Sequence, residues 1–144
     1  DANSDFTRDS VTNPELPGFD DSKWRVLALP PAWSIEDIPH QKAGITVGPF
    51  SKESPGDAAT GRTIGGTGWY RKTFTLDASY TRKLITIYFE GAYMETDVWV
   101  NGHHAGEHKY GYTSFYFDIT KYCKPPGQSN VIAVRVINKG KNSR

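Results

Sequence analysis

The alternation of short strand-forming runs with turn residues limits the fold of this chain more than any other feature. Helical periodicity is nearly absent, and runs of β-branched and aromatic residues are separated by Gly, Pro, Asn and Asp. Runs of this kind form strands, and turn residues spaced regularly between them are typical of sandwiches. We therefore expect an all-β fold, an antiparallel β-sandwich, in a chain whose 144 residues suffice for one core.

About seven runs have the composition of strands. In the last run Ile132, Val134 and Val136 recur at every second position, which places them on one face. The predicted strands are residues 24–29, 69–76, 84–89, 96–100, 103–105, 113–117 and 131–137.

Three turn features connect these runs. Asn101-Gly102 predicts a type I′ hairpin, because both residues tolerate a positive φ, and its register decides which face Trp99 occupies. Asp118 and Thr120 predict a single helical turn, since both cap free N–H groups well. We expect Gly91 to occupy a turn that a β-carbon would crowd.

Two stretches show no strand pattern. Residues 1–18 are rich in polar residues and are predicted to be an irregular N-terminal segment, with the domain covering residues 19–144. Residues 38–66 form a long Gly- and Pro-containing stretch. A loop of that length in a compact domain is usually functional or disordered.

Charge and composition exclude several classes of function. The 17 basic and 16 acidic residues are scattered, which argues against nucleic acid or an acidic membrane as the partner. No apolar run approaches the roughly 20 residues that span a bilayer. Cys123 is the only cysteine, so no internal disulfide can form.

The sequence offers only weak support for any reactive group. Glu95 and Asp97 share a strand face and could pair as glycosidase carboxylates, but strand carboxylates are far more often structural. A Cys123 nucleophile has no obvious histidine partner, so a structural thiol is the default. No catalytic residue is predicted.

No metal or cofactor is predicted either. His103 and His104 are adjacent in a strand and must point to opposite faces, so at most a subset of them with Glu107 and His108 could converge on a metal. The run Gly-Gly-Thr-Gly at 65–68 lacks the Gly-Lys-Ser/Thr and helix of a phosphate loop.

Six segments in order resemble the sugar-binding domain of family 2 glycoside hydrolases, over about residues 19–144. The strongest are Phe-Glu-Gly-Ala-Tyr-Met at 89–94 and Asp-Val-Trp-Val-Asn-Gly at 97–102. The others are the Phe-Asp-Asp-Ser-Lys-Trp run from 19, the Gly-Gly-Thr-Gly-Trp-Tyr run from 65, residues 111–120 and residues 130–136. Pro31 and Ala32 replace the usual His and Asp before Trp33.

The resemblance implies a jelly-roll, galactose-binding-domain-like sandwich that packs beside a catalytic barrel. The barrel would carry both catalytic glutamates, so we expect this chain to be a fragment of a β-galactosidase-like enzyme. Members of the family usually have a further strand before residue 19, and we expect that strand to be missing or altered here. Carbohydrate is the expected partner, through the full-length enzyme.

The resemblance also indicates where sugar could be contacted. Gly65, Gly66 and Thr67 match a loop that reaches the sugar in some β-galactosidases, where Gly65 replaces an asparagine and leaves only backbone groups. Asn142 lies where some relatives carry a sugar-binding aspartate, and an amide can donate to and accept from a hydroxyl. A plain loop asparagine is the alternative.

Three functions stay open at this point. The chain could be an accessory domain without activity of its own, a carbohydrate-binding module with exposed stacking rings, or a protein-interaction sandwich. The last would need a large exposed apolar patch. β-Glucuronidase and β-mannosidase remain alternative parent activities.

Overall fold

The computed structural model describes residues 3–8, 12–29, 31 and 66–138, and within them the fold is built almost wholly of strands. Two 3-10 turns, η2 (Ala78–Tyr80) and η3 (Thr120–Tyr122), are the helical elements of this described part. None of its helices is long and apolar enough to cross a membrane.

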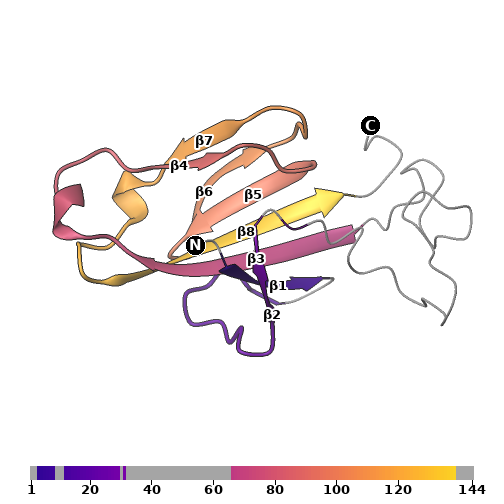
Figure 1. The fold of residues 1–144 in the computed structure, drawn as a ribbon, viewed down its shortest axis with the longest axis horizontal. Helices are drawn as coiled ribbons and strands as arrows, with labels where there is room; N and C mark the ends of the chain where they lie inside the picture. Colours follow the sequence, from indigo (N-terminus) through magenta and orange to yellow (C-terminus); the bar gives the residue numbers. More distant parts are fainter. Residues whose placement is uncertain (1–2, 9–11, 30, 32–65, 139–144) are drawn as a thin grey trace, which may run out of the picture.

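Six strands form the larger sheet, in the order β2-β1-β3-β8-β5-β6, and each pair of neighbours is antiparallel. β4 and β7 form a second, two-stranded antiparallel sheet. Figure 1 shows this small sheet lying over one face of the larger one. The strand bounds are β1 (Asn3–Arg8), β2 (Arg25–Ala28), β3 (Gly66–Thr75), β4 (Thr86–Phe89), β5 (Glu95–Val100), β6 (His103–His108), β7 (Phe115–Asp118) and β8 (Ser129–Asn138).

The core lies between the two sheets. The predicted alternation in β8 is confirmed, because Ile132, Val134 and Val136 are all buried there. Val98 and Val100 of β5 are fully buried beside them, and Ile87, Phe89 and Phe117 of the small sheet pack against the cluster. The all-β antiparallel sandwich expected from the sequence is therefore confirmed.

The predicted hairpin at Asn101-Gly102 is also present. The two residues have φ of 51° and 82°, and β5 and β6 pair on either side. The register shifts between Val98 and Trp99, so that Trp99 pairs with His104 while Val98 pairs with Gly106. The extra residue in β6 forms a bulge. Alternation along β5 places Val98 in the core and Trp99 on the opposite face.

The prediction of an irregular N-terminal segment is wrong for β1, because Asn3–Arg8 forms a strand between β2 and β3. The same strand overturns the expectation that an earlier strand is missing. Its sequence, Asn-Ser-Asp-Phe-Thr-Arg, is poor in β-branched and apolar residues, so local propensity gave no signal. Backbone pairing on both sides stabilises it instead.

The expectation for Gly91 is wrong as well. A β-carbon there would meet only the Gly111 carbonyl oxygen at 3.9 Å, an ordinary contact. The crowded glycines are Gly106, where a β-carbon would lie 2.3 Å from the Phe117 ring, and Gly111, where it would lie 2.2 Å from the Tyr93 ring. Both contacts are between residues distant in sequence, so the sequence could not show them.

The predicted helical turn after β7 is confirmed as η3. The N-cap of η3 is Ile119, and the Asp118 carboxylate just before it accepts a hydrogen bond from the Thr120 N–H at 2.9 Å, as in an Asx turn. The predicted long stretch at 38–66 lies outside the described residues apart from Gly66, the first residue of β3.

Candidate functional site

Three strands meet at the end of the sandwich where β3 begins (Figure 1). Thr67 of β3 and Glu95 of β5 both pair with Ile137, near the end of β8. The Ile137 carbonyl also accepts a hydrogen bond from the Met94 N–H at 3.2 Å, which ties the loop before β5 to the same place. Two of the predicted sugar-contacting residues, Gly66 and Thr67, lie at this end and are partly exposed.

The backbone conformation of Gly66 is one that favours glycine. Its φ is 152°, a region that residues with a β-carbon rarely adopt. The other two predicted residues, Gly65 and Asn142, lie outside the described residues. The sugar-contacting roles of all four therefore stay predictions.

Glu95 and Asp97 do not form a pair of free carboxylates. The Arg135 guanidinium donates to Asp97 Oδ2 at 2.8 and 3.3 Å, and His104 Nε2 lies 3.1 Å from Asp97 Oδ1. Glu95 is exposed at the start of β5. Asp97 is thus held by two side chains in a structural network. This agrees with a structural rather than a catalytic role for the pair.

Two tryptophans complete this network on the sheet face away from the core. The rings of Trp69 and Trp99 lie 5.3 Å apart, and the Arg135 guanidinium carbon lies 5.8 and 5.6 Å from their centroids. Cation–π contacts of this kind contribute about 0.5–1 kcal/mol each at partly exposed sites. The arrangement fixes β3, β5 and β8 to one another and engages both carboxylate oxygens of Asp97.

Three other carboxylates cap backbone N–H groups. Hydrogen bonds from the side chain and backbone of Ser22 lower the pKa of Asp20, and those from Ser79 and Thr120 lower the pKa of Asp77 and Asp118 in the same way. A glycosidase general acid needs the opposite shift, a raised pKa. These aspartates are suited to structure rather than proton transfer.

The histidines of β6 diverge, as the sequence predicted. His103 stacks on Tyr122 with centroids 5.4 Å apart, whereas His104 contacts Asp97 and Trp99 on the other face. His108 stacks on Phe115 at 4.2 Å. In the described part of the chain, no three His, Cys, Asp or Glu side chains are grouped as metal ligands.

Cys123 is half-buried beside the core cluster. Burial, with a smaller contribution from the nearby Asp118 charge, raises the pKa of its thiol. A raised pKa disfavours the thiolate that nucleophilic chemistry requires. The thiol therefore packs as an apolar group.

The structure also exposes a group of tyrosines that the sequence pattern does not distinguish. Tyr88, Tyr110, Tyr112 and Tyr116 are all more than half exposed, and they lie in β4, in β7 and between β6 and β7. The high aromatic content, 13%, was the only signal in the sequence. It could not separate these rings from core rings, because burial depends on the pairing of β4 with β7.

Comparison with known proteins places the chain in a family. Residues 21–143 match the family described as glycosyl hydrolases family 2, sugar binding domain. The chain belongs to this family. The chain is 45% identical over 122 residues to the β-galactosidase BoGH2A of Bacteroides ovatus and 42% identical over 122 residues to a putative β-glucuronidase of Formosa agariphila. These matches cover 85% and 83% of the chain but only 13% and 10% of the relatives.

Solved structures of family 2 glycosyl hydrolases contain a domain with the same fold as this chain. A glycosyl hydrolase family 2 member from Bacteroides cellulosilyticus superposes with a TM-score of 0.78 and 44% identity, over 97% of this chain and 17% of that one. A Bacteroides uniformis β-glucuronidase superposes with a TM-score of 0.76 and 28% identity, over 96% and 14%. The sandwich thus spans a small part of each of these relatives.

Proposed function

We propose that this family 2 domain is the non-catalytic, sugar-binding accessory part of a larger glycoside hydrolase that removes terminal β-galactosides. The observation that carries the proposal is the state of the described carboxylates: Asp97 is held by Arg135 and His104, and Asp20, Asp77 and Asp118 cap turns with lowered pKa values. Hydrolysis of a glycosidic bond requires two carboxyl groups across that bond, one with a raised pKa.

The end of the sandwich at Gly66 and Thr67 supports the accessory role. Three strands meet there, and β8 ends at Asn138, four positions before Asn142 in sequence. We propose that this end borders the substrate entrance of a neighbouring catalytic barrel, on which the domain packs. Asn142 would then donate to or accept from a sugar hydroxyl, and the backbone at 65–67 would supply further hydrogen bonds.

Galactoside specificity is supported by the 45% identity to a β-galactosidase, while the relatives also include β-glucuronidases. The test is to compare this chain with its longer natural polypeptide on chromogenic β-galactoside, β-glucuronide and β-mannoside substrates. We expect the chain alone to hydrolyse none of them and the longer polypeptide to prefer the β-galactoside. Turnover by the chain alone contradicts the accessory role, and preference for the glucuronide contradicts the specificity.

The contact from Asn142 is tested in the longer polypeptide. Asn142→Ala should raise KM for the β-galactoside about tenfold, which corresponds to loss of one hydrogen bond of about 1.4 kcal/mol. Gln128→Ala, an exposed amide side chain just before the start of β8 and so at its other end, is the control and should leave KM unchanged. Equal KM values in all three proteins would remove Asn142 from the sugar site.

A carbohydrate-binding surface on the chain itself is the second candidate, and the exposed tyrosines favour it.

A further inference from the structure

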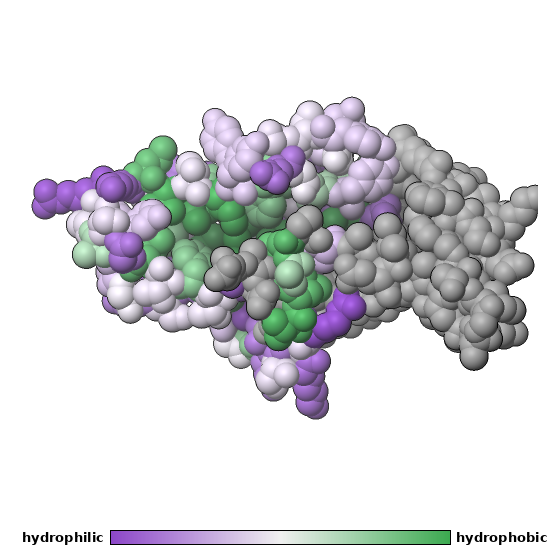
Figure 2. All heavy atoms as spheres, in the orientation of Figure 1, coloured by the Kyte–Doolittle hydropathy of each residue, from purple (hydrophilic) through white to green (hydrophobic). Residues whose placement is uncertain are grey.

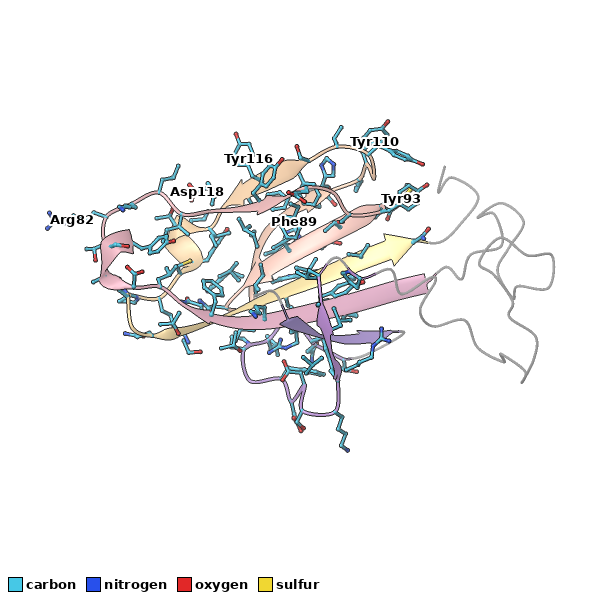
Figure 3. The ribbon with its side chains drawn as sticks, viewed as in Figure 1. Arg82, Phe89, Tyr93, Tyr110, Tyr116 and Asp118 are labelled. Carbon is cyan, nitrogen blue, oxygen red and sulfur yellow. The ribbon has the colours of Figure 1, made fainter. Side chains whose placement is uncertain are left out.

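Four exposed tyrosines lie on the small sheet and in the loop before β7, and we call them the tyrosine face: Tyr88, Tyr110, Tyr112 and Tyr116. Their exposed fractions are 61%, 56%, 70% and 69%. Tyr88 and Tyr116 are direct partners across the β4–β7 pairing, so their rings stand side by side on the outer side of the small sheet. In Figure 3, Tyr110 and Tyr116 both lie along the top of the molecule, away from the larger sheet.

Ring contacts hold part of the tyrosine face in place. Tyr112 meets Tyr93 edge to face at 5.4 Å and Tyr110 at 5.7 Å. Gly111 allows this arrangement, since a β-carbon there would lie 2.2 Å from the Tyr93 ring. Rings that are already ordered lose less entropy when a ligand stacks on them.

The segment that carries Tyr110 and Tyr112 is anchored on both sides. His108, which ends β6, stacks on Phe115 with centroids 4.2 Å apart and an interplanar angle of 16°. Its Nε2 lies 3.1 Å from the Thr113 hydroxyl. The two tyrosines therefore project from a fixed loop rather than from a free one.

The chemistry of the tyrosine face differs from that of the apolar surface elsewhere. The exposed aliphatic side chains of the described part are Leu16, Val26 and Leu29 near β2, and Leu84 before β4. Figure 2 shows mostly purple shades along the top, with a green group at its left end, and a green patch lower down. Every large ring of the tyrosine face instead carries an uncharged hydroxyl.

We propose that the tyrosine face binds a neutral glycan chain, with its hexose rings stacked on the tyrosines and its hydroxyls bonded to the phenolic oxygens. A flat ring with a polar tip matches the two sides of a sugar ring, which has an apolar face and a polar rim. An apolar protein partner would match the aliphatic surface instead. The inference rests on the proposed function, because a glycosidase domain would meet such chains.

The position of the tyrosine face gives this binding a role. Tyr93 contacts Tyr112, and the next residue, Met94, donates its N–H to Ile137, the partner of Thr67. Figure 3 shows Tyr93 and Tyr110 at the end of the sandwich where β8 finishes. The tyrosine face therefore begins beside the proposed sugar-contacting end, and it holds the distal part of a long substrate.

The test is affinity electrophoresis of this chain in gels that contain a neutral β-galactan, β-glucan or β-mannan. We expect at least one polymer to retard the wild type. Tyr112→Ala and the double variant Tyr88→Ala/Tyr116→Ala should each raise the apparent Kd about tenfold, the equivalent of about 1.4 kcal/mol of lost stacking. Tyr116→Phe should keep most of the retardation because the ring remains.

Tyr80→Ala is the matched control, since Tyr80 is 43% exposed in η2 outside the tyrosine face, and it should migrate as the wild type does. Near-ultraviolet circular dichroism confirms that each variant is folded. The proposal is overturned if no neutral polymer retards the wild type, or if the tyrosine variants match Tyr80→Ala. It is also overturned if the tyrosine variants lower only the melting temperature of the longer polypeptide, which would make this surface an interdomain contact.

The outcome is separable from that of the proposed function. Retardation by a polymer does not depend on hydrolysis, whereas the KM effect of Asn142→Ala is measured from the hydrolysis of a small galactoside. A negative result for polymer retardation therefore leaves the proposed function untouched, and a negative KM result leaves the tyrosine face untouched.

Discussion

The side-chain amide of Asn101 joins three segments of the chain, although its sequence context predicted only a turn residue. Its Nδ2 group donates to the Tyr122 carbonyl and to Asn130 Oδ1, both at 2.8 Å, and its Oδ1 accepts from the Val131 N–H at 3.0 Å. Asn130 is fully buried and also accepts from the Lys124 N–H. The hairpin turn is therefore fixed to η3 and to β8.

We predict that Asn101→Gly lowers the free energy of unfolding by about 1–3 kcal/mol. Glycine keeps the positive φ of 51° but removes the donor to the Tyr122 carbonyl and the acceptor of the Val131 N–H, both partly buried. Asn13→Gly, at another positive φ (57°) on the surface, is the control and should change stability by a few tenths of a kcal/mol. Urea denaturation measures both. Equal effects would mean that the turn geometry alone matters at Asn101.

Thr96 presents a different case, since its hydroxyl is buried without a hydrogen-bond partner in the described structure. We predict that Thr96→Val is neutral or raises the free energy of unfolding by up to about 1 kcal/mol, because the methyl group replaces an unpaired polar atom in the same space. Thr96→Ser keeps the hydroxyl, loses the methyl and should destabilise. A clearly less stable Thr96→Val protein in urea would show that the hydroxyl has a partner.

At the scale of elements, Arg71 holds the N-terminal segment to the larger sheet. This arginine of β3 is 4% exposed, and its guanidinium donates to Asp21 at 2.7 Å, to the Leu16 carbonyl at 3.1 Å and to the Pro14 carbonyl. The segment also reaches the hairpin turn, where a β-carbon at Gly102 would lie 3.2 Å from Pro17.

We predict that Arg71→Met lowers the free energy of unfolding by at least about 2 kcal/mol, because three buried or partly buried acceptors lose their donor. Asp21→Asn should cost less, about 1 kcal/mol, since Asp21 is partly exposed and an amide can still accept a hydrogen bond. Hydrogen exchange should show faster exchange of the Trp24 and Phe19 amides in Arg71→Met. Unchanged exchange there would contradict the anchoring role.

The capped turns predict how stability depends on pH. Hydrogen bonds hold the pKa of Asp20, Asp77 and Asp118 below 3.8 in the folded state. Since these folded-state pKa values are lowered, the contribution to stability is present above pH 3.8 and is lost as pH falls through the folded values. The triple change of these aspartates to Asn should therefore matter less at pH 2.5 than at pH 6 in urea denaturation. A constant difference between the two proteins would contradict this.

The sequence predicted strands where side chains alternate and failed where backbone pairing decides. β5, β7 and β8 carry β-branched or aromatic residues, so their patterns were readable. β1 carries none of these signals beyond Phe6 and Thr7, and it exists because β2 and β3 lie on both sides of it. The same contrast holds for the candidate site. The sequence shows its motifs, whereas the tyrosine face can be recognised only once β4 is paired with β7.

For the whole molecule, the contact between the two sheets depends on glycine at one point. Gly106 lies in β6 opposite Val98, and a β-carbon there would come within 2.3 to 2.5 Å of two Phe117 ring atoms in β7. The Phe117 ring packs against the core, so it cannot move aside without displacing its neighbours. The small sheet, and with it the tyrosine face, is therefore positioned by this close approach.

We predict that Gly106→Ala lowers the free energy of unfolding by about 1–3 kcal/mol, the usual cost of overpacking a core. Because the strain falls on β7, the variant should also weaken glycan retardation, even though it leaves every tyrosine in place. Gly91→Ala is the matched control: its β-carbon has room, and fewer conformations in the unfolded chain should make it neutral or slightly stabilising. If Gly106→Ala unfolds at the same urea concentration as Gly91→Ala, the two sheets are not held at the spacing that the Phe117 contact implies.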